Sequence, residues 1–193
     1  MKKIERSEIL ALGDYETVRD RFRRRIIEMK KNRRIAVGDH MTFIFENRDT
    51  VLFQIQEMLR VERITSEKGI AHEVETYNSM VPGKGELFAT LMIEYEDREE
   101  RQRMLRELAG LRNHLSLRIG DAKITGDIEL LPGEEEDRLP AVNYVRFEVG
   151  DVAGALRDES QHATLEVDHP AYRATTDLPM ATRKALADDL DEP

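Results

Sequence analysis

The chain has 193 residues, of which 40% are hydrophobic, and 39 acidic residues against 30 basic ones give it a formal net charge of −9. This length allows one self-sufficient core. The negative charge repels nucleic acid and anionic membranes, which disfavours general nucleic-acid binding. Because cysteine is absent, disulfides, thiolate zinc sites, all-cysteine iron–sulfur clusters and cysteine nucleophiles are excluded.

The N-terminal region predicts a cytoplasmic location and a basic helix. Its start, MKKIERSEIL, has no apolar signal core, and no later run reaches the roughly 20 apolar residues of a membrane span. Apolar side chains then recur at helical spacing from Tyr15 to Lys31, and arginine and lysine fill most of the other positions. We therefore expect a helix with a strongly basic outer face.

The most informative segment runs from Ile35 to Arg63 and predicts a strand, a turn and a helix. In the strand, one face carries apolar side chains and the other carries His40 and Glu46. Asp49 stands before an apolar helical stripe, where its carboxylate could accept hydrogen bonds from the first free amides of the helix. The apolar residues spread beyond one stripe, which predicts semi-buried surroundings for the polar residues among them.

In the remaining chain, apolar residues recur at helical spacing in some stretches and at strand spacing in others. We expect helices over Ser66–Met80 and Asp97–Arg112, a strand over Glu86–Glu96, a hairpin over Leu115–Leu131, a loop over Pro132–Pro140, strands over Ala141–Val149, Ala163–Asp168 and Tyr172–Asp177, and a last helix after Pro179. The prediction is one α+β domain over residues 1–193, with an antiparallel-rich sheet and helices packed on one side. It is helix-rich over 1–114 and strand-rich over 115–178, and ends in a helix with a frayed acidic tail over 179–193.

The sharpest chemical hypothesis joins the two ends of the predicted strand and the following helix in one site. An imidazole with carboxylates can ligate a transition metal or form an acid–base pair. The residues are His40, Glu46, Asp49, Gln54, Glu57 and Arg60. The alternative, which we favour, is that Asp49 caps the helix and the other polar groups satisfy neighbouring backbone.

The basic run RDRFRRRIIEMKKNRR, from Arg19 to Arg34, is a candidate binding face. It holds nine cationic side chains against Asp20 and Glu28, enough to attract an acidic or phosphate-rich ligand. On this face, the candidate partner-binding residues are Arg19, Arg23, Lys30 and Arg34. The simpler interpretation is an ordinary solvated helix face, and an acidic protein partner is the next choice.

The blocks MTFIFENRDTVLFQIQEMLRVERI, KKNRRIAVGDH and YNSMVPGKGELFATLMIE resemble a bacterial family catalogued as domain of unknown function 3501. The resemblance extends to about Pro170 and is most specific at FENRDTVLFQIQEM. It implies gene neighbours that are rubrerythrin-like or are iron–sulfur proteins related to heterodisulfide reductase, and hence a link to peroxide or redox metabolism. It supplies no catalytic residues. The polar members of its most specific block are Glu46, Asn47, Arg48, Asp49, Gln54 and Glu57.

Two functions of different kinds follow from these observations. The first is an accessory or interaction protein that docks on a rubrerythrin-like or iron–sulfur redox partner. The second is a small-molecule- or metal-binding enzyme with its site around His40, Glu46 and the start of the following helix. Nucleic-acid regulation through the basic run is a weaker third hypothesis, and a homodimer through an exposed sheet edge is a further alternative.

Overall fold

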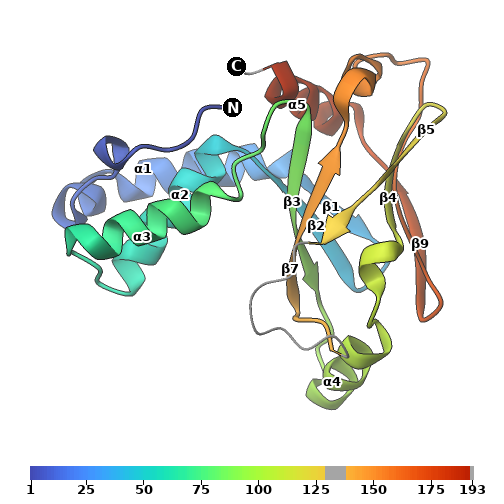
Figure 1. Ribbon diagram of the computed structural model, residues 1–193, viewed down its shortest axis with the longest axis horizontal. Helices are drawn as coiled ribbons and strands as arrows, with labels where there is room; N and C mark the ends of the chain where they lie inside the picture. The colour runs from blue at the N-terminus through green and yellow to red at the C-terminus, as the bar shows by residue number, and fades with distance from the viewer. Residues whose placement is uncertain (129–137, 192–193) are drawn as a thin grey trace.

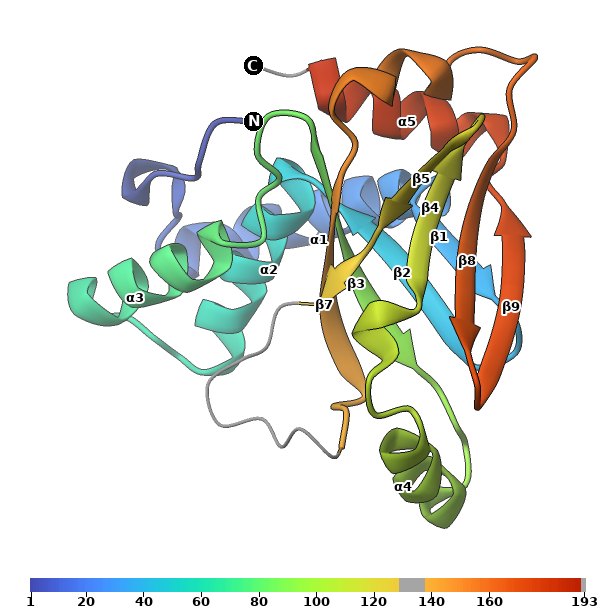
Figure 2. The same cartoon turned by 45° about the vertical axis from the view of Figure 1, so that its right-hand side comes forward.

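The computed structural model describes residues 1–128 and 138–191, and it confirms an α+β fold whose sheets are antiparallel. The strands form two sheets rather than one (Figures 1 and 2). Sheet A has the order β1 (Arg34–Val37), β2 (Met41–Glu46), β3 (Glu86–Ile93), β7 (Val142–Glu148) and β6 (Asp127–Ile128). Sheet B has the order β5 (Ala122–Thr125), β4 (Leu115–Ile119), β8 (Ala163–His169) and β9 (Tyr172–Asp177).

The main core lies between the two sheets, because each strand turns alternate apolar side chains inward. Phe43 and Phe45 on β2 face this core, as the alternation predicts, together with Leu117 and Leu165 from sheet B. Helix α5 (Met180–Asp191) adds Leu186 to the same core and covers one end of it (Figure 2).

The two sheets are tied together at their edges. Gly126 lies where the chain passes from β5 in sheet B to β6 in sheet A. A Cβ atom there would lie 2.8 Å from the Phe147 ring and 2.9 Å from Val145, so the crossing needs a glycine. At the opposite edge, the Tyr172 hydroxyl donates to the Val37 carbonyl at 2.7 Å, which fastens β9 to β1.

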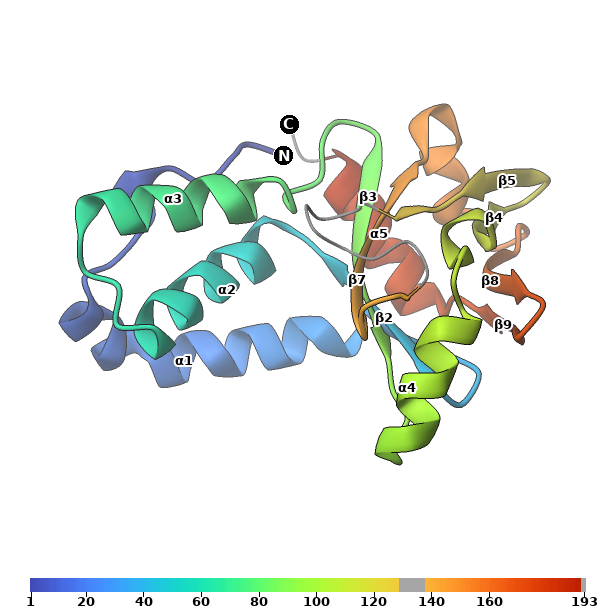
Figure 3. The same cartoon turned by 60° about the horizontal axis from the view of Figure 1, so that its bottom comes forward.

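The N-terminal helices extend away from the outer face of sheet A (Figure 3). They are the short η1 (Arg6–Glu8), α1 (Leu12–Lys31), α2 (Arg48–Val61) and α3 (Glu67–Asn78). A second apolar cluster joins the α2 stripe of Val51, Ile55 and Leu59 to α3 and reaches Phe88 on the sheet. Helix α4 (Arg98–Glu107) and the short turns η2 (Leu111–Asn113) and η3 (Gly150–Leu156) lie beside the sandwich.

The start of α2 corrects one prediction from the sequence. Asn47, not Asp49, is the N-cap: its side chain accepts from the Thr50 amide at 3.1 Å, and the Thr50 hydroxyl accepts from the Asn47 amide at 2.9 Å. This reciprocal pair satisfies two otherwise free donors, so the helix begins two residues earlier than expected. Asp49 lies in the first turn, where its carboxylate pairs with Arg25 on α1.

Most of the other predicted elements are present with shifted ends. The patterns do not predict β1, and the helix expected to reach Arg112 ends at Glu107. Parts of the predicted return strand, the following loop and the acidic tail fall at 129–137 and 192–193, outside the described residues. None of the described helices combines the length and apolarity needed to cross a membrane.

Candidate functional site

His40 and Glu46, the two residues at the centre of the predicted site, lie at opposite ends of β2. His40 is in the turn before the strand and Glu46 is its last residue, and a strand rises about 3.3 Å per residue, which separates their backbones by about 20 Å. The sequence predicts that both side chains share one face of the strand, but His40 lies outside β2. The length of the strand keeps their side chains in separate surroundings.

His40 lies in an acidic surface pocket of about 610 Å³. Its ring stacks on Tyr95, with centroids 4.0 Å apart and planes inclined by 19°, and its Nδ1 lies 3.0 Å from the Glu94 carbonyl oxygen. The pocket is lined by Asp39, His40, Glu94, Tyr95, Glu96, Asp97 and Glu100. Across the described ranges, no group of three His, Asp or Glu side chains could hold a metal ion.

Glu46 is buried on the outer face of sheet A, with 3% of its surface exposed. The Thr90 hydroxyl donates to Oε1 at 2.9 Å, but Oε2 has no hydrogen-bond partner. Burial, and next the charge of Glu46, raise the pKa of the Tyr144 hydroxyl on β7. A buried carboxylate oxygen without a donor is costly, so this position calls for a functional explanation.

Asn47 touches a buried ion pair that the sequence analysis does not predict. Arg33 pairs with Asp189 on α5, with Nη2 donating to Oδ1 at 2.7 Å, and Asn47 Nδ2 donates to the same oxygen at 3.4 Å. The two charged side chains are only 6% and 4% exposed. Asp189 was expected in a frayed tail, but this pair anchors it. Only long-range contact information could have found the pair, because its members come from opposite ends of the chain.

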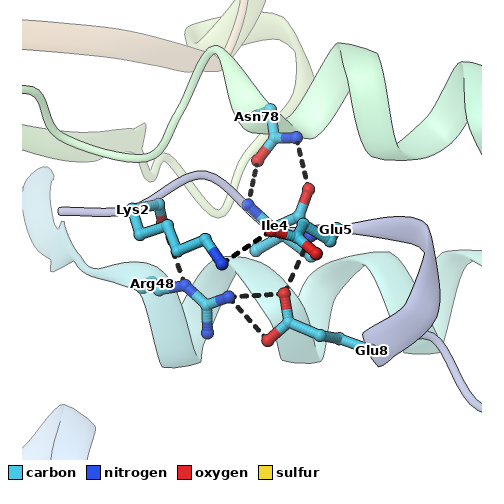
Figure 4. A network of polar contacts seen from close by, with 6 residues as sticks. All are labelled: Lys2, Ile4, Glu5, Glu8, Arg48 and Asn78. Atoms are coloured by element: carbon cyan, nitrogen blue, oxygen red, sulfur yellow. Dashed lines mark hydrogen bonds and ion pairs between the residues drawn. The ribbon is translucent and has the colours of Figure 1, made fainter.

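Arg48 fastens the N-terminal segment to α2 (Figure 4). Its guanidinium donates to both Glu8 carboxylate oxygens, at 2.6 and 2.5 Å, and to the Lys2 carbonyl at 2.9 Å. Asn78 at the end of α3 bonds both the amide and the carbonyl of Ile4, at 2.8 and 2.9 Å. These contacts give Arg48 a structural role.

Glu57 and Arg60 on α2 contact side chains of α1. Glu57 Oε1 accepts from the Tyr15 hydroxyl at 2.7 Å and its carboxylate accepts two bonds from Arg19, both at 2.8 Å. Arg19, opposed by burial and aided by Tyr15, lowers the pKa of Glu57 to about 2. Arg60 lies 3.4 Å from Glu57 and 3.7 Å from Glu16. The Nε2 atom of Gln54, on the same helix, is buried and has no partner.

The basic face of α1 is open along most of its length. Only Tyr15 and Ile26 are buried in this helix of 20 residues. Arg19 turns toward Glu57, whereas Arg21, Arg23 and Arg24 are exposed. Among the described residues, no carboxylate pairs with any of these three arginines, or with Lys30 or Arg34.

Apolar side chains interrupt this basic face. Val18 is 40% exposed and Ile27 is 44% exposed. A groove of about 360 Å³ is lined by Val18, Arg21, Phe22 and Arg25. The sequence analysis noted that aromatic residues are sparse here, but it did not anticipate that Phe22 would line a groove between arginines.

Comparisons with known proteins support the fold but name no activity. A sequence model described as "Protein of unknown function (DUF3501)" matches residues 3–190. A crystal structure of a protein of unknown function from Burkholderia pseudomallei K96243 is similar to this chain, with a TM-score of 0.91 and 33% sequence identity. The similarity covers 98% of this chain and 100% of that one. A search of curated proteins finds no match.

Proposed function

We propose that this chain, which belongs to the DUF3501 family of proteins of unknown function, is a cytoplasmic interaction protein that docks on an acidic partner through α1. The observation that carries this proposal is the open face of α1. Three of its arginines, Arg21, Arg23 and Arg24, lack carboxylate partners among the described residues, although the whole chain has a net charge of −9. A cationic surface on an acidic molecule favours one orientation of approach to an acidic partner.

The apolar groove distinguishes this face from an ordinary solvated helix. Exposed arginines alone would provide attraction that salt screens easily. Here Val18 and Phe22 line a groove together with Arg21 and Arg25. A partner can bury an apolar side chain there while one of its carboxylates pairs with Arg21, since Arg25 is already paired with Asp49. Arginine beside an aromatic residue is a common composition for the centre of a protein interface.

The partner that we propose is a rubrerythrin-like redox protein, which the family resemblance implies. Without cysteine, this chain has no thiol chemistry of its own, so we assign it an accessory role on that partner. A shared catalytic site of His40 and Glu46 is not part of the proposal, because β2 separates them.

The proposal is tested by titrating the full chain with a purified rubrerythrin-like protein from the same cell. The test variant is Arg21→Gln/Arg23→Gln/Arg24→Gln on α1. The matched control is Arg98→Gln/Arg106→Gln/Arg112→Gln, which removes the same charge from exposed arginines in and after α4. We expect saturable binding that only the α1 variant weakens, by about tenfold or more. Absence of binding at low salt, or equal weakening by both variants, would contradict the proposal.

A further inference from the structure

The outer face of sheet A carries a polar cluster at the end of β2, separate from the α1 face. In the register of the sheet, Ile44 pairs with Thr90 and Thr90 pairs with Tyr144, while Glu46 lies one step along the same face of β2. Directly paired residues of antiparallel strands project to the same side. Glu46, Thr90 and Tyr144 therefore lie side by side on neighbouring strands.

Only one of the two carboxylate oxygens of Glu46 accepts a hydrogen bond in this cluster. Thr90 donates to Oε1 at 2.9 Å, whereas Oε2 is buried and accepts no hydrogen bond. Arg146, which is paired with Phe88 in the register of the sheet, lies over the Phe88 ring at 5.1 Å and pairs with Glu86 at 3.0 Å. Within the described chain, therefore, one acceptor oxygen of Glu46 has no donor.

Two tyrosines, Tyr144 and Tyr77, belong to the same cluster. The Tyr144 ring stacks on Phe88, with centroids 6.0 Å apart, and Tyr77 approaches from α3. Burial raises the pKa of both hydroxyls, and the next contribution comes from Glu46 for Tyr144 and from Tyr144 for Tyr77. Both tyrosines pack against the second apolar cluster. Neither phenolic oxygen has a hydrogen-bond partner in the described part of the chain.

We infer that Glu46, with Thr90, Tyr144 and Tyr77, forms a binding site for a small organic cation that carries N–H donors, such as a primary ammonium or a guanidinium group. The carboxylate oxygen and the phenolic oxygens accept hydrogen bonds, and aromatic faces attract cations. A donor at Oε2 would form a charge-assisted hydrogen bond in a protected setting. No trio of metal-binding side chains exists in the described residues, which favours an organic cation over a metal ion.

The test is calorimetric titration of the full chain with agmatine, putrescine and methylguanidinium. Tetramethylammonium is the matched probe for methylguanidinium, because both carry one positive charge but only methylguanidinium has N–H donors. We expect at least one of the three donors to bind with a Kd below about 1 mM, and we expect tetramethylammonium not to bind. Failure of all three donors, or equal binding of tetramethylammonium, would overturn the inference.

Variants locate the binding. Glu46→Gln should weaken it by about tenfold or more, since a hydrogen bond to a charged group contributes about 1.5–3 kcal/mol. Glu94→Gln removes an exposed carboxylate that accepts from Thr42 on the same sheet, and it should leave binding unchanged. If Glu46→Gln does not fold, Tyr144→Phe keeps the ring and should still weaken binding severalfold. If Glu46→Gln and Tyr144→Phe both bind the cation as well as the natural chain does, the cation binds elsewhere and the site is rejected.

Discussion

Arg33 and Asp189, which are 156 residues apart in sequence, form a buried ion pair that joins the turn between α1 and β1 to α5. Asn47 donates to the same carboxylate, so the pair also contacts the cap of α2. The C-terminal helix is thereby fixed to the strand–helix unit that the sequence marks as most distinctive. An interior ion pair tolerates the loss of one partner poorly, because the remaining charge stays buried.

Asp189→Ala should therefore destabilise the protein by about 3–5 kcal/mol, measured by urea unfolding. Asp188→Ala is the control, because Asp188 is an exposed partner of Arg157, and it should change the unfolding free energy by less than about 1 kcal/mol. The combined Arg33→Met/Asp189→Leu variant should recover much of the loss. Equal effects of the two aspartate variants would show that the buried pair does not hold α5.

The Tyr15–Glu57–Arg19 cluster should make stability depend on pH under acidic conditions. The pKa of Glu57 is lowered from 4.5 to about 2, so the native state binds its proton less readily than the unfolded chain does. The resulting stabilisation is present above pH 4.5 and is lost as the pH falls toward 2. Unfolding curves across this range should show a smaller decline for Glu57→Gln than for the natural protein. Parallel declines would contradict this assignment.

Glu46→Gln should stabilise the ligand-free protein. The change removes a buried negative charge that has one satisfied oxygen and one without a donor, and it keeps the shape of the side chain. A gain of about 1 kcal/mol would raise the Tm by about 2–4 °C in a chain of this size. Glu94→Gln, at an exposed position, should leave the Tm within about a degree. A lower Tm for Glu46→Gln would mean that the carboxylate is structural rather than reserved for a ligand.

Gly126→Ala should disturb the crossing between the two sheets. The added Cβ would lie within 2.8–3.1 Å of Phe147, Val145 and Leu115, and overpacking of this kind costs about 1–3 kcal/mol. Gly154→Ala is the control, because a Cβ there meets nothing within 4 Å. Chemical unfolding of both variants tests the prediction. Similar stability of the two would show that the sandwich edge can shift to accept a side chain.

Local pattern was enough to predict most elements of this fold but not the contacts between them. The alternation around Phe43 and Phe45 correctly identifies the core face of β2, because a strand repeats every two residues. The same pattern predicts that His40 and Glu46 share one face, but a shared face does not bring two residues close together when they lie at opposite ends of the strand. Local pattern also cannot show that Asp189 returns to Arg33, since that contact depends on how the sheets pack.

Helix capping gives a second example of this limit. Asp49 and Asn47 are both good capping residues, and the choice between them depends on the reciprocal bond with Thr50. The basic run likewise predicts a charged face, but only the fold separates Arg19, which pairs with Glu57, from the open Arg21, Arg23 and Arg24.

The salt dependence of binding to a rubrerythrin-like protein tests the central claim most directly. The Kd would be measured over a series of salt concentrations for the natural chain and for Arg21→Gln/Arg23→Gln/Arg24→Gln. If α1 is the docking face, affinity of the natural chain falls steeply as salt rises, whereas the variant binds weakly and with a shallow dependence. An affinity that is independent of salt, or a variant with the same slope as the natural chain, would contradict the account.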